Sequence, residues 1–131
     1  MRDLEKNQIK VWYSLYKDKE PVLKDGSETG QYREVYTDPI AVRASVSPAT
    51  GASETELFGA SVQYDRILST VRDLPIDEYS RLWVEKPPLL EEDGSLTLDK
   101  DGKAVTPHDY TVKRVARGLN QNLWAIAKVV R

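Results

Sequence analysis

The amino-acid sequence predicts an all-β protein, a small barrel or sandwich of six to seven strands. Short segments in which apolar and polar residues alternate follow one another along the 131 residues, and proline, glycine and aspartate interrupt them as in turns. The pattern contains no long amphipathic helix, and many short strands favour a barrel or a sandwich. The length is typical of one domain. We predict a single domain over residues 1–131 with no internal repeat.

The N-terminal part of the chain predicts three strands. Residues 9–16 alternate between apolar and polar side chains, as in a strand with one buried face. Residues 18–30 hold one proline and two glycines and are expected to form a long turn. A short strand over 31–37 would return from it, and the next strand would cover 40–46. That strand places four apolar residues on one face: Ile40, Val42, Ala44 and Val46.

Residues 47–61 interrupt this alternation and predict a long loop between strands. Gly51 favours a turn, and Glu54 and Glu56 would suit the acidic start of one short helical turn. Phe58 is the only phenylalanine in the chain. It either anchors the loop to the core or lies exposed for a partner, and the first arrangement is the commoner one for phenylalanine.

The middle of the chain predicts two further strands. Residues 62–70 alternate again, residues 73–79 suit a turn, and residues 81–86 form the next strand, which Pro87-Pro88 ends because proline cannot donate to a ladder. One face of the strand over 62–70 would carry Val62, Tyr64 and Leu68, and the other face would carry Ile67.

The C-terminal part predicts an acidic excursion followed by two strands. Residues 88–106 are acidic and rich in turn signals, and we expect a hairpin or a mobile loop there, with a turn at Asp101-Gly102. Residues 110–117 fit a strand with a bulge near Lys113-Arg114, although their spacing also fits a helix. Residues 123–130 are apolar on both faces, which is typical of a central, buried strand.

Composition limits the chemistry that the chain can perform. Lysine and arginine number 19 against 21 acidic residues, so the net charge is −2, and a protein that binds nucleic acid non-specifically needs a positive field. The chain has no cysteine and one histidine, which excludes a cysteine nucleophile, a disulfide scaffold and a metal site of several histidines. No signal peptide or membrane span is evident. We predict a protein that is not an enzyme and that has no metal, cofactor or membrane partner.

Charge is distributed unevenly over the last third of the chain. Residues 110–131 carry five basic residues and no acid, whereas residues 85–101 carry six acids against two lysines. Three interpretations remain open: a nucleic-acid face, a head-to-tail contact between subunits, and ordinary pairing within one chain. For the second, the candidate contact residues are Glu91, Glu92, Asp93, Lys113, Arg114 and Arg117.

Several segments together resemble the head–tail joining proteins of tailed bacteriophages, also called head-closure or stopper proteins. The resemblance covers residues 36–86 and 108–131. It rests on residues 39–51, Glu54, Glu56, Phe58-Gly59 and Gln63-Tyr64-Asp65, then on residues 74–78, 82–84, 109–116 and 125–129.

The resemblance implies a small β-barrel with a long loop between early strands and no enzymatic activity. It implies a virion protein, assembled in the host cytoplasm, that forms a homo-oligomeric ring beneath the portal and adaptor proteins. Such a ring closes the DNA channel and presents a surface to the tail proteins, and packaged DNA passes through it. The loop over 47–61 would then face neighbouring subunits or the channel. Its candidate contact residues are Thr50, Gly51, Glu54, Glu56 and Phe58.

Other functions remain as alternatives. The chain could serve as the adaptor or the tail-terminator component of the same connector. A small barrel that binds single-stranded nucleic acid is the alternative from another class, and an enzyme that uses His108 with Asp109 is the third. The nucleic-acid alternative would use Tyr110, Lys113, Arg114, Trp124 and Lys128.

Overall fold

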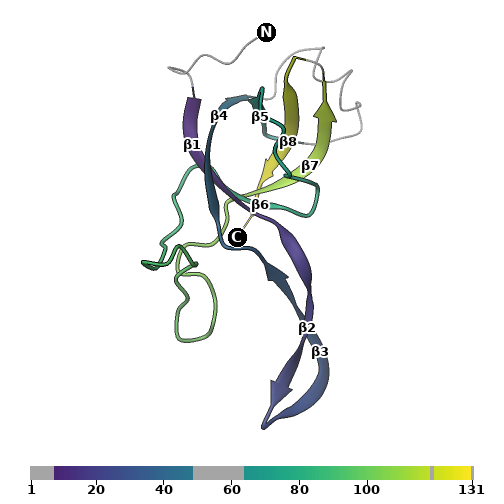
Figure 1. Ribbon diagram of the computed structural model, residues 1–131, viewed down its shortest axis with the longest axis vertical. Coiled ribbons are helices and arrows are strands. Elements are labelled where there is room, and N and C mark those ends of the chain that lie inside the picture. The colour runs from purple at the N-terminus through teal and green to yellow at the C-terminus, as the bar shows by residue number, and fades with distance from the viewer. Residues whose placement is uncertain (1–7, 49–63, 119, 131) are drawn as a thin grey trace.

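The computed structural model describes residues 8–48, 64–118 and 120–130, and their fold is all-β (Figure 1). Six strands close an antiparallel barrel in the order β1-β4-β5-β8-β7-β6, and β2 and β3 pair separately as a hairpin. This confirms the predicted barrel. The strands are β1 (Gln8–Ser14), β2 (Tyr16–Lys24), β3 (Ser27–Tyr36), β4 (Ile40–Pro48), β5 (Arg66–Thr70), β6 (Arg81–Trp83), β7 (Tyr110–Arg117) and β8 (Asn122–Lys128).

The barrel interior is filled by the alternating apolar residues of its strands. Val11 and Tyr13 of β1 and Val42 and Ala44 of β4 are buried there, as their alternation predicts. Trp124 of β8 lies at the centre with no exposed surface. The rest of the interior cluster is Leu68, Leu74, Ile76, Leu82, Val84, Tyr110, Val112 and Ile126.

The described residues include no helix that could cross a membrane.

A hairpin arm, formed by β2 and β3, replaces the long turn predicted over residues 18–30. The arm extends away from the barrel along the longest axis of the molecule (Figure 1), and Asp25 and Gly26, at φ 54° and 82°, form its two-residue turn. Aspartate followed by glycine suits such a hairpin turn because both positions require positive φ. The other two turn signals mark irregularities in the ladder: its register shifts after Pro21, and Gly30 has φ 82°. The prediction was wrong because bulges and turns use the same residues.

Two predicted strands differ from the structure in the middle of the chain. β4 continues through Pro48, so the predicted loop does not begin at residue 47. β5 has Leu68 on the barrel interior and Ile67 outside, as predicted, but Tyr64 packs with Ile67 rather than beside Leu68. Residues before Tyr64 in this strand prediction lie outside the described residues.

The strand predicted over residues 81–86 stops after Trp83. Residues 84–86 turn their main-chain N–H groups to the carboxylate of Asp109, at 2.8, 2.8 and 3.0 Å, instead of to a neighbouring strand. β7 is a strand rather than a helix, with the predicted bulge between Val112 and Arg114. β8 ends at Lys128 rather than at residue 130.

Candidate functional site: assembly surfaces

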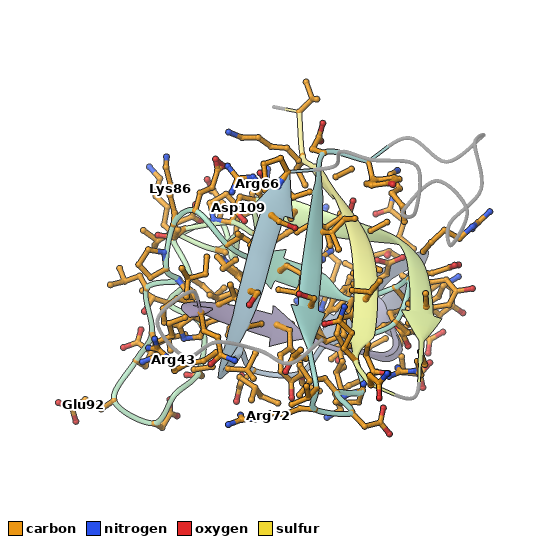
Figure 2. The ribbon with its side chains drawn as sticks, turned by 90° about the horizontal axis from the view of Figure 1, so that it is seen from above. Arg43, Arg66, Arg72, Lys86, Glu92 and Asp109 are labelled. Carbon is orange, nitrogen blue, oxygen red and sulfur yellow. The ribbon has the colours of Figure 1, made fainter. Side chains whose placement is uncertain are left out.

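Asp109 fixes the chain just before the acidic excursion, residues 88–106, which lies between β6 and β7. Its carboxylate accepts the N–H groups of Val84, Glu85 and Lys86, and its own N–H donates to the carbonyl of Leu82 at 3.0 Å. Figure 2 shows Asp109 and Lys86 at the same edge of the barrel. Charge-assisted hydrogen bonds are the strong ones. Asp109 is therefore a latch that holds β6 to β7.

The acidic excursion consists of two successive turns with the same hydrogen bonding. Glu91 N–H donates to Ser95 and Gly94 N–H to Glu91, and eight positions later Asp99 donates to Lys103 and Gly102 to Asp99. Bridges join Leu90 to Leu96 and Leu98 to Ala104, so the predicted hairpin at Asp101-Gly102 is confirmed. The same turn thus occurs twice within this segment, eight residues apart.

A tryptophan on the outside of the barrel anchors the acidic excursion. Trp83 of β6 is only 2 % exposed although it points away from the interior, and its Nε1 donates to the carbonyl of Thr106 at 2.8 Å. The ring of His108 lies edge-on against it, with centroids 6.2 Å apart. The excursion is thus packed against the barrel by an apolar contact as well as by the Asp109 latch.

The tip of the excursion presents acidic side chains to solvent. Glu91, Glu92 and Asp93 are all exposed, and none of them forms an ion pair within the described residues. The Ser95 hydroxyl and N–H donate to Asp93, which lowers the pKa of that carboxyl and keeps it ionised. We call these three residues the acidic tip.

The basic residues of β7 differ in what they contact. Arg117 is a clamp: its guanidinium donates to Asp73 at 2.7 Å and to the carbonyls of Leu74 and Ile76 at 3.0 and 3.2 Å. Arg114 forms one exposed pair with Glu78 at 3.3 Å, which contributes little. Lys113 is exposed and forms no ion pair among the described residues. Lys113 and Arg114, which we call the basic edge, are the two cations of β7 that do not bind the main chain of residues 73–76.

The acidic excursion and strand β7, which carry the acidic tip and the basic edge, lie on opposite sides of the molecule. In Figure 1 the acidic excursion lies to the left of the barrel and β7 to the right, and Figure 2, which views the molecule from above, again places the excursion at the left and β7 at the right. A surface on one side that complements a surface on the other is the arrangement of a head-to-tail contact. The three predicted acidic contact residues and the two basic ones, Lys113 and Arg114, therefore cannot pair with each other within one chain. Arg117, the sixth predicted contact residue, instead contacts residues 73–76 of its own chain.

The arm is exposed on both faces, and the contacts with the barrel that the described part of the chain shows lie at its root. From Lys17 to Glu34 most of its side chains are exposed, including Leu23 at 59 % and Tyr32 at 62 %. At the root, the Arg81 guanidinium lies 3.8 Å over the ring of Tyr36 and pairs with Glu34 at 3.9 Å. Tyr16 packs edge-on against Tyr36, with centroids 5.7 Å apart. The strand predicted over 31–37 lies largely within β3. The sequence analysis missed β2 and the first part of β3, although the Asp-Gly turn between polar alternating segments is a hairpin signal.

Burial raises the pKa of the Tyr36 phenol, and its hydrogen bond to Glu34 raises it further, against the opposing effect of Arg81. Tyr36 therefore stays neutral under physiological conditions, with its O–H donating to Glu34 at 3.0 Å. The cation, the ring and the carboxylate form one brace between the barrel and the arm.

Replacement of Arg81 with leucine should loosen the arm and leave the barrel folded. Amide hydrogen exchange in β2 and β3 should accelerate roughly 2- to 30-fold, because the brace loses a cation–π contact of roughly 0.5–2 kcal/mol. Arg81→Lys is the matched control, since it keeps the charge and loses the planar stacking, and it should give an intermediate rate. Equal exchange in all three proteins would show that Arg81 does not hold the arm.

The residues predicted for nucleic-acid binding and for an enzyme that uses His108 have other roles in the structure. Tyr110 is 2 % exposed and Trp124 is fully buried, so neither ring can stack on a nucleic-acid base in this fold. Lys128 pairs with Glu85 at 3.0 Å, and hydrogen bonding to Glu85 raises the pKa of its ammonium. Asp109, the acid predicted to assist His108, is bound to the three main-chain N–H groups of its latch.

The predicted loop contacts Thr50, Gly51, Glu54, Glu56 and Phe58 lie outside the described residues. Within the described ranges, no group of three or more histidine, aspartate or glutamate side chains is placed to hold a metal ion. In comparisons with known proteins, no family model, no curated protein and no solved structure matches this chain.

Proposed function

We propose that this chain is a structural protein of a tailed bacteriophage, which assembles as a ring at the head–tail connector, closes the DNA channel and offers a surface for tail attachment. The observation that carries the proposal is that the acidic excursion, which carries the acidic tip, and strand β7, which carries the basic edge, lie on opposite sides of the molecule (Figures 1 and 2). Its second support is the sequence resemblance to head–tail joining proteins.

Head-to-tail contact between the two surfaces repeats from copy to copy. The acidic tip of one subunit would meet Lys113 and Arg114 of the next, and such contacts close into a ring when the rotation between neighbours permits it. Opposite charges at the contact fix its register and disfavour wrong partners. The closed barrel suits this role because a barrel has no free sheet edge for non-specific pairing.

Deletion of the gene from the phage genome that carries it tests the proposal. Electron microscopy should show heads that leak DNA or lack tails, beside free tails of normal length. Complementation with the intact gene should restore complete particles. Complete, infectious particles from the deletion would contradict a connector function.

Charge reversal tests the ring contact in the same complementation assay. Glu91→Lys with Glu92→Lys, or Lys113→Glu with Arg114→Glu, should each reduce infectious particles at least about tenfold, because like charges then face each other across every contact. The variant with all four changes restores opposite charges and should recover most of the loss. Arg72→Glu is the control for reversal of an exposed charge elsewhere, because Arg72 lies outside both contact surfaces and the arm. Failure of the fourfold variant to recover would contradict this pairing.

A further inference from the structure

The two free edges of the arm are not alike. β2 carries three exposed lysines, Lys17, Lys19 and Lys24, and one proline, Pro21, whereas β3 carries neither residue type. Lysine and proline on an edge strand are the features by which natural proteins prevent another strand from adding to it. The sequence therefore protects the β2 edge and leaves the β3 edge open.

The main-chain hydrogen bonding shows which groups point to these edges. The N–H of Lys19 donates to the carboxylate of its neighbour Asp18 at 2.7 Å, so it does not point into the ladder. Lys19 pairs with Glu34, and Pro21, two residues along in the same phase, pairs with Tyr32. These are the non-hydrogen-bonded pairs of an antiparallel ladder, in which the N–H and C=O groups of both residues point away from the partner strand. Of the two outward positions on β2, Lys19 has an N–H that is already bonded to Asp18, and Pro21 has no N–H.

On β3 the corresponding outward residues are Tyr32 and Glu34, and by the same pairing rule their N–H and C=O groups point to the free edge. Tyr32 also exposes 62 % of its surface beside this edge. An extended segment that pairs there would gain main-chain hydrogen bonds and could cover the Tyr32 ring. Addition of a strand to an exposed sheet edge is a common mode of recognition, and a two-stranded hairpin alone is marginally stable, so it gains from a third strand.

We propose that the β3 edge of the arm, centred on Tyr32, accepts an extended segment of a different protein of the connector as a third strand. This proposal rests on the proposed function. In a ring, neighbouring copies are related by rotation and would present β3 of one arm to β2 of the next, and the β2 edge is protected. The arm also extends along the long axis of the molecule, across the direction from the acidic tip to the basic edge (Figures 1 and 2). The arm therefore reaches a protein stacked on the ring and not its own neighbour.

Two proline variants test the edge directly. Tyr32→Pro removes the outward N–H of β3, and Lys19→Pro removes the outward N–H of the protected β2 edge, so the second is the matched control. The probes are the purified proteins encoded by the genes on either side of this one, each mixed with the full chain. Tyr32→Pro should weaken the complex with one of them roughly 5- to 100-fold, since a partner carbonyl then loses its donor. Lys19→Pro should leave the affinity within about twofold, the change expected where no main-chain bond is lost.

Residue-resolved amide hydrogen exchange on the unaltered chain gives an independent readout. Binding should slow exchange at Tyr32 and Glu34 and leave Lys19 unaffected. A complex that forms without protection of Tyr32 and Glu34 would overturn the strand-addition proposal and leave the proposed function standing. If exchange at Tyr32 and Glu34 slows when the concentration of the chain alone is raised, a second copy is the occupant, and the proposal of a different protein is overturned as well. Absence of a complex with either neighbour would count against both proposals, and normal particles from the deleted phage would then refute the function itself.

Discussion

Replacement of Asp109 with alanine should lower the free energy of unfolding by about 2–4 kcal/mol. The carboxylate accepts three main-chain N–H groups at 2.8–3.0 Å, and each hydrogen bond to a charged group contributes roughly 1.5–3 kcal/mol where water is excluded. Glu85 and Lys86 are exposed, so their N–H groups can return to water and part of the loss is recovered. The expected loss of stability is therefore well below the sum for three such hydrogen bonds. Urea denaturation followed by tryptophan fluorescence measures it.

Two further variants separate the latch from a general effect of charge removal. Asp109→Asn keeps one acceptor oxygen of the two that the carboxylate uses, and it should lose about half as much stability. Asp65→Ala is the matched control, because within residues 8–48, 64–118 and 120–130 the Asp65 carboxylate accepts one N–H, that of Lys128 at 2.7 Å, and it should lose about 1 kcal/mol. If Asp109→Ala were no more destabilising than Asp65→Ala, the latch would not hold the excursion.

The latch also explains why β6 is shorter than the sequence pattern predicts. Residues 81–86 have the alternation of a strand, and Val84 is buried as that pattern requires. The strand stops because the carboxylate of Asp109, 23 to 25 residues away, takes its next N–H groups. Alternation reports which side chains are buried, whereas strand length depends on main-chain partners that only the tertiary fold supplies.

The barrel strands were predictable because each one encodes its own buried face. Val11 and Tyr13 in β1, and Val42 and Ala44 in β4, point inward at every second position. The arm was not predictable in this way, since neither of its faces is buried and its ladder contains a proline and a glycine. A segment of this kind has no apolar face to set its period, and its turn chemistry at Asp25-Gly26 is the one local signal.

The candidate contact residues show the same division. The acidic tip was predictable because clustered acids in a turn-rich segment are exposed by default. The roles of the basic residues were not, because Arg114 and Arg117 are near neighbours with the same side chain. Arg114 forms one exposed pair, whereas Arg117 meets two carbonyls and an aspartate from residues 73–76. That difference depends on where another segment crosses β7, which composition and spacing do not encode.

Replacement of Arg117 with alanine should lower the free energy of unfolding by about 2–4 kcal/mol. The guanidinium bonds the carbonyls of Leu74 and Ile76 and lies over the ring of Trp124, with its carbon 5.7 Å from the ring centroid. Leu74 and Ile76 are part of the barrel core although they lie outside its strands. Loss of the clamp removes the donor of the Leu74 carbonyl, a cost of roughly 1–3 kcal/mol, and the cation–π contact with Trp124, roughly 0.5–2 kcal/mol. The Ile76 carbonyl keeps the Nε1 of Trp124 as a donor at 3.0 Å.

Arg117→Lys keeps the charge but cannot reproduce the planar fork that meets two carbonyls and a carboxylate, so it should recover less than half of the loss. Arg114→Ala, which removes one exposed pair, should cost about 0–1 kcal/mol, and equal losses at the two positions would contradict the clamp. The comparison matters for assembly, because a variant of Arg117 that fails to form particles would fail through its fold. Lys113 and Arg114 can be changed while the barrel stays intact, so they are the positions at which a ring contact can be distinguished from a structural one.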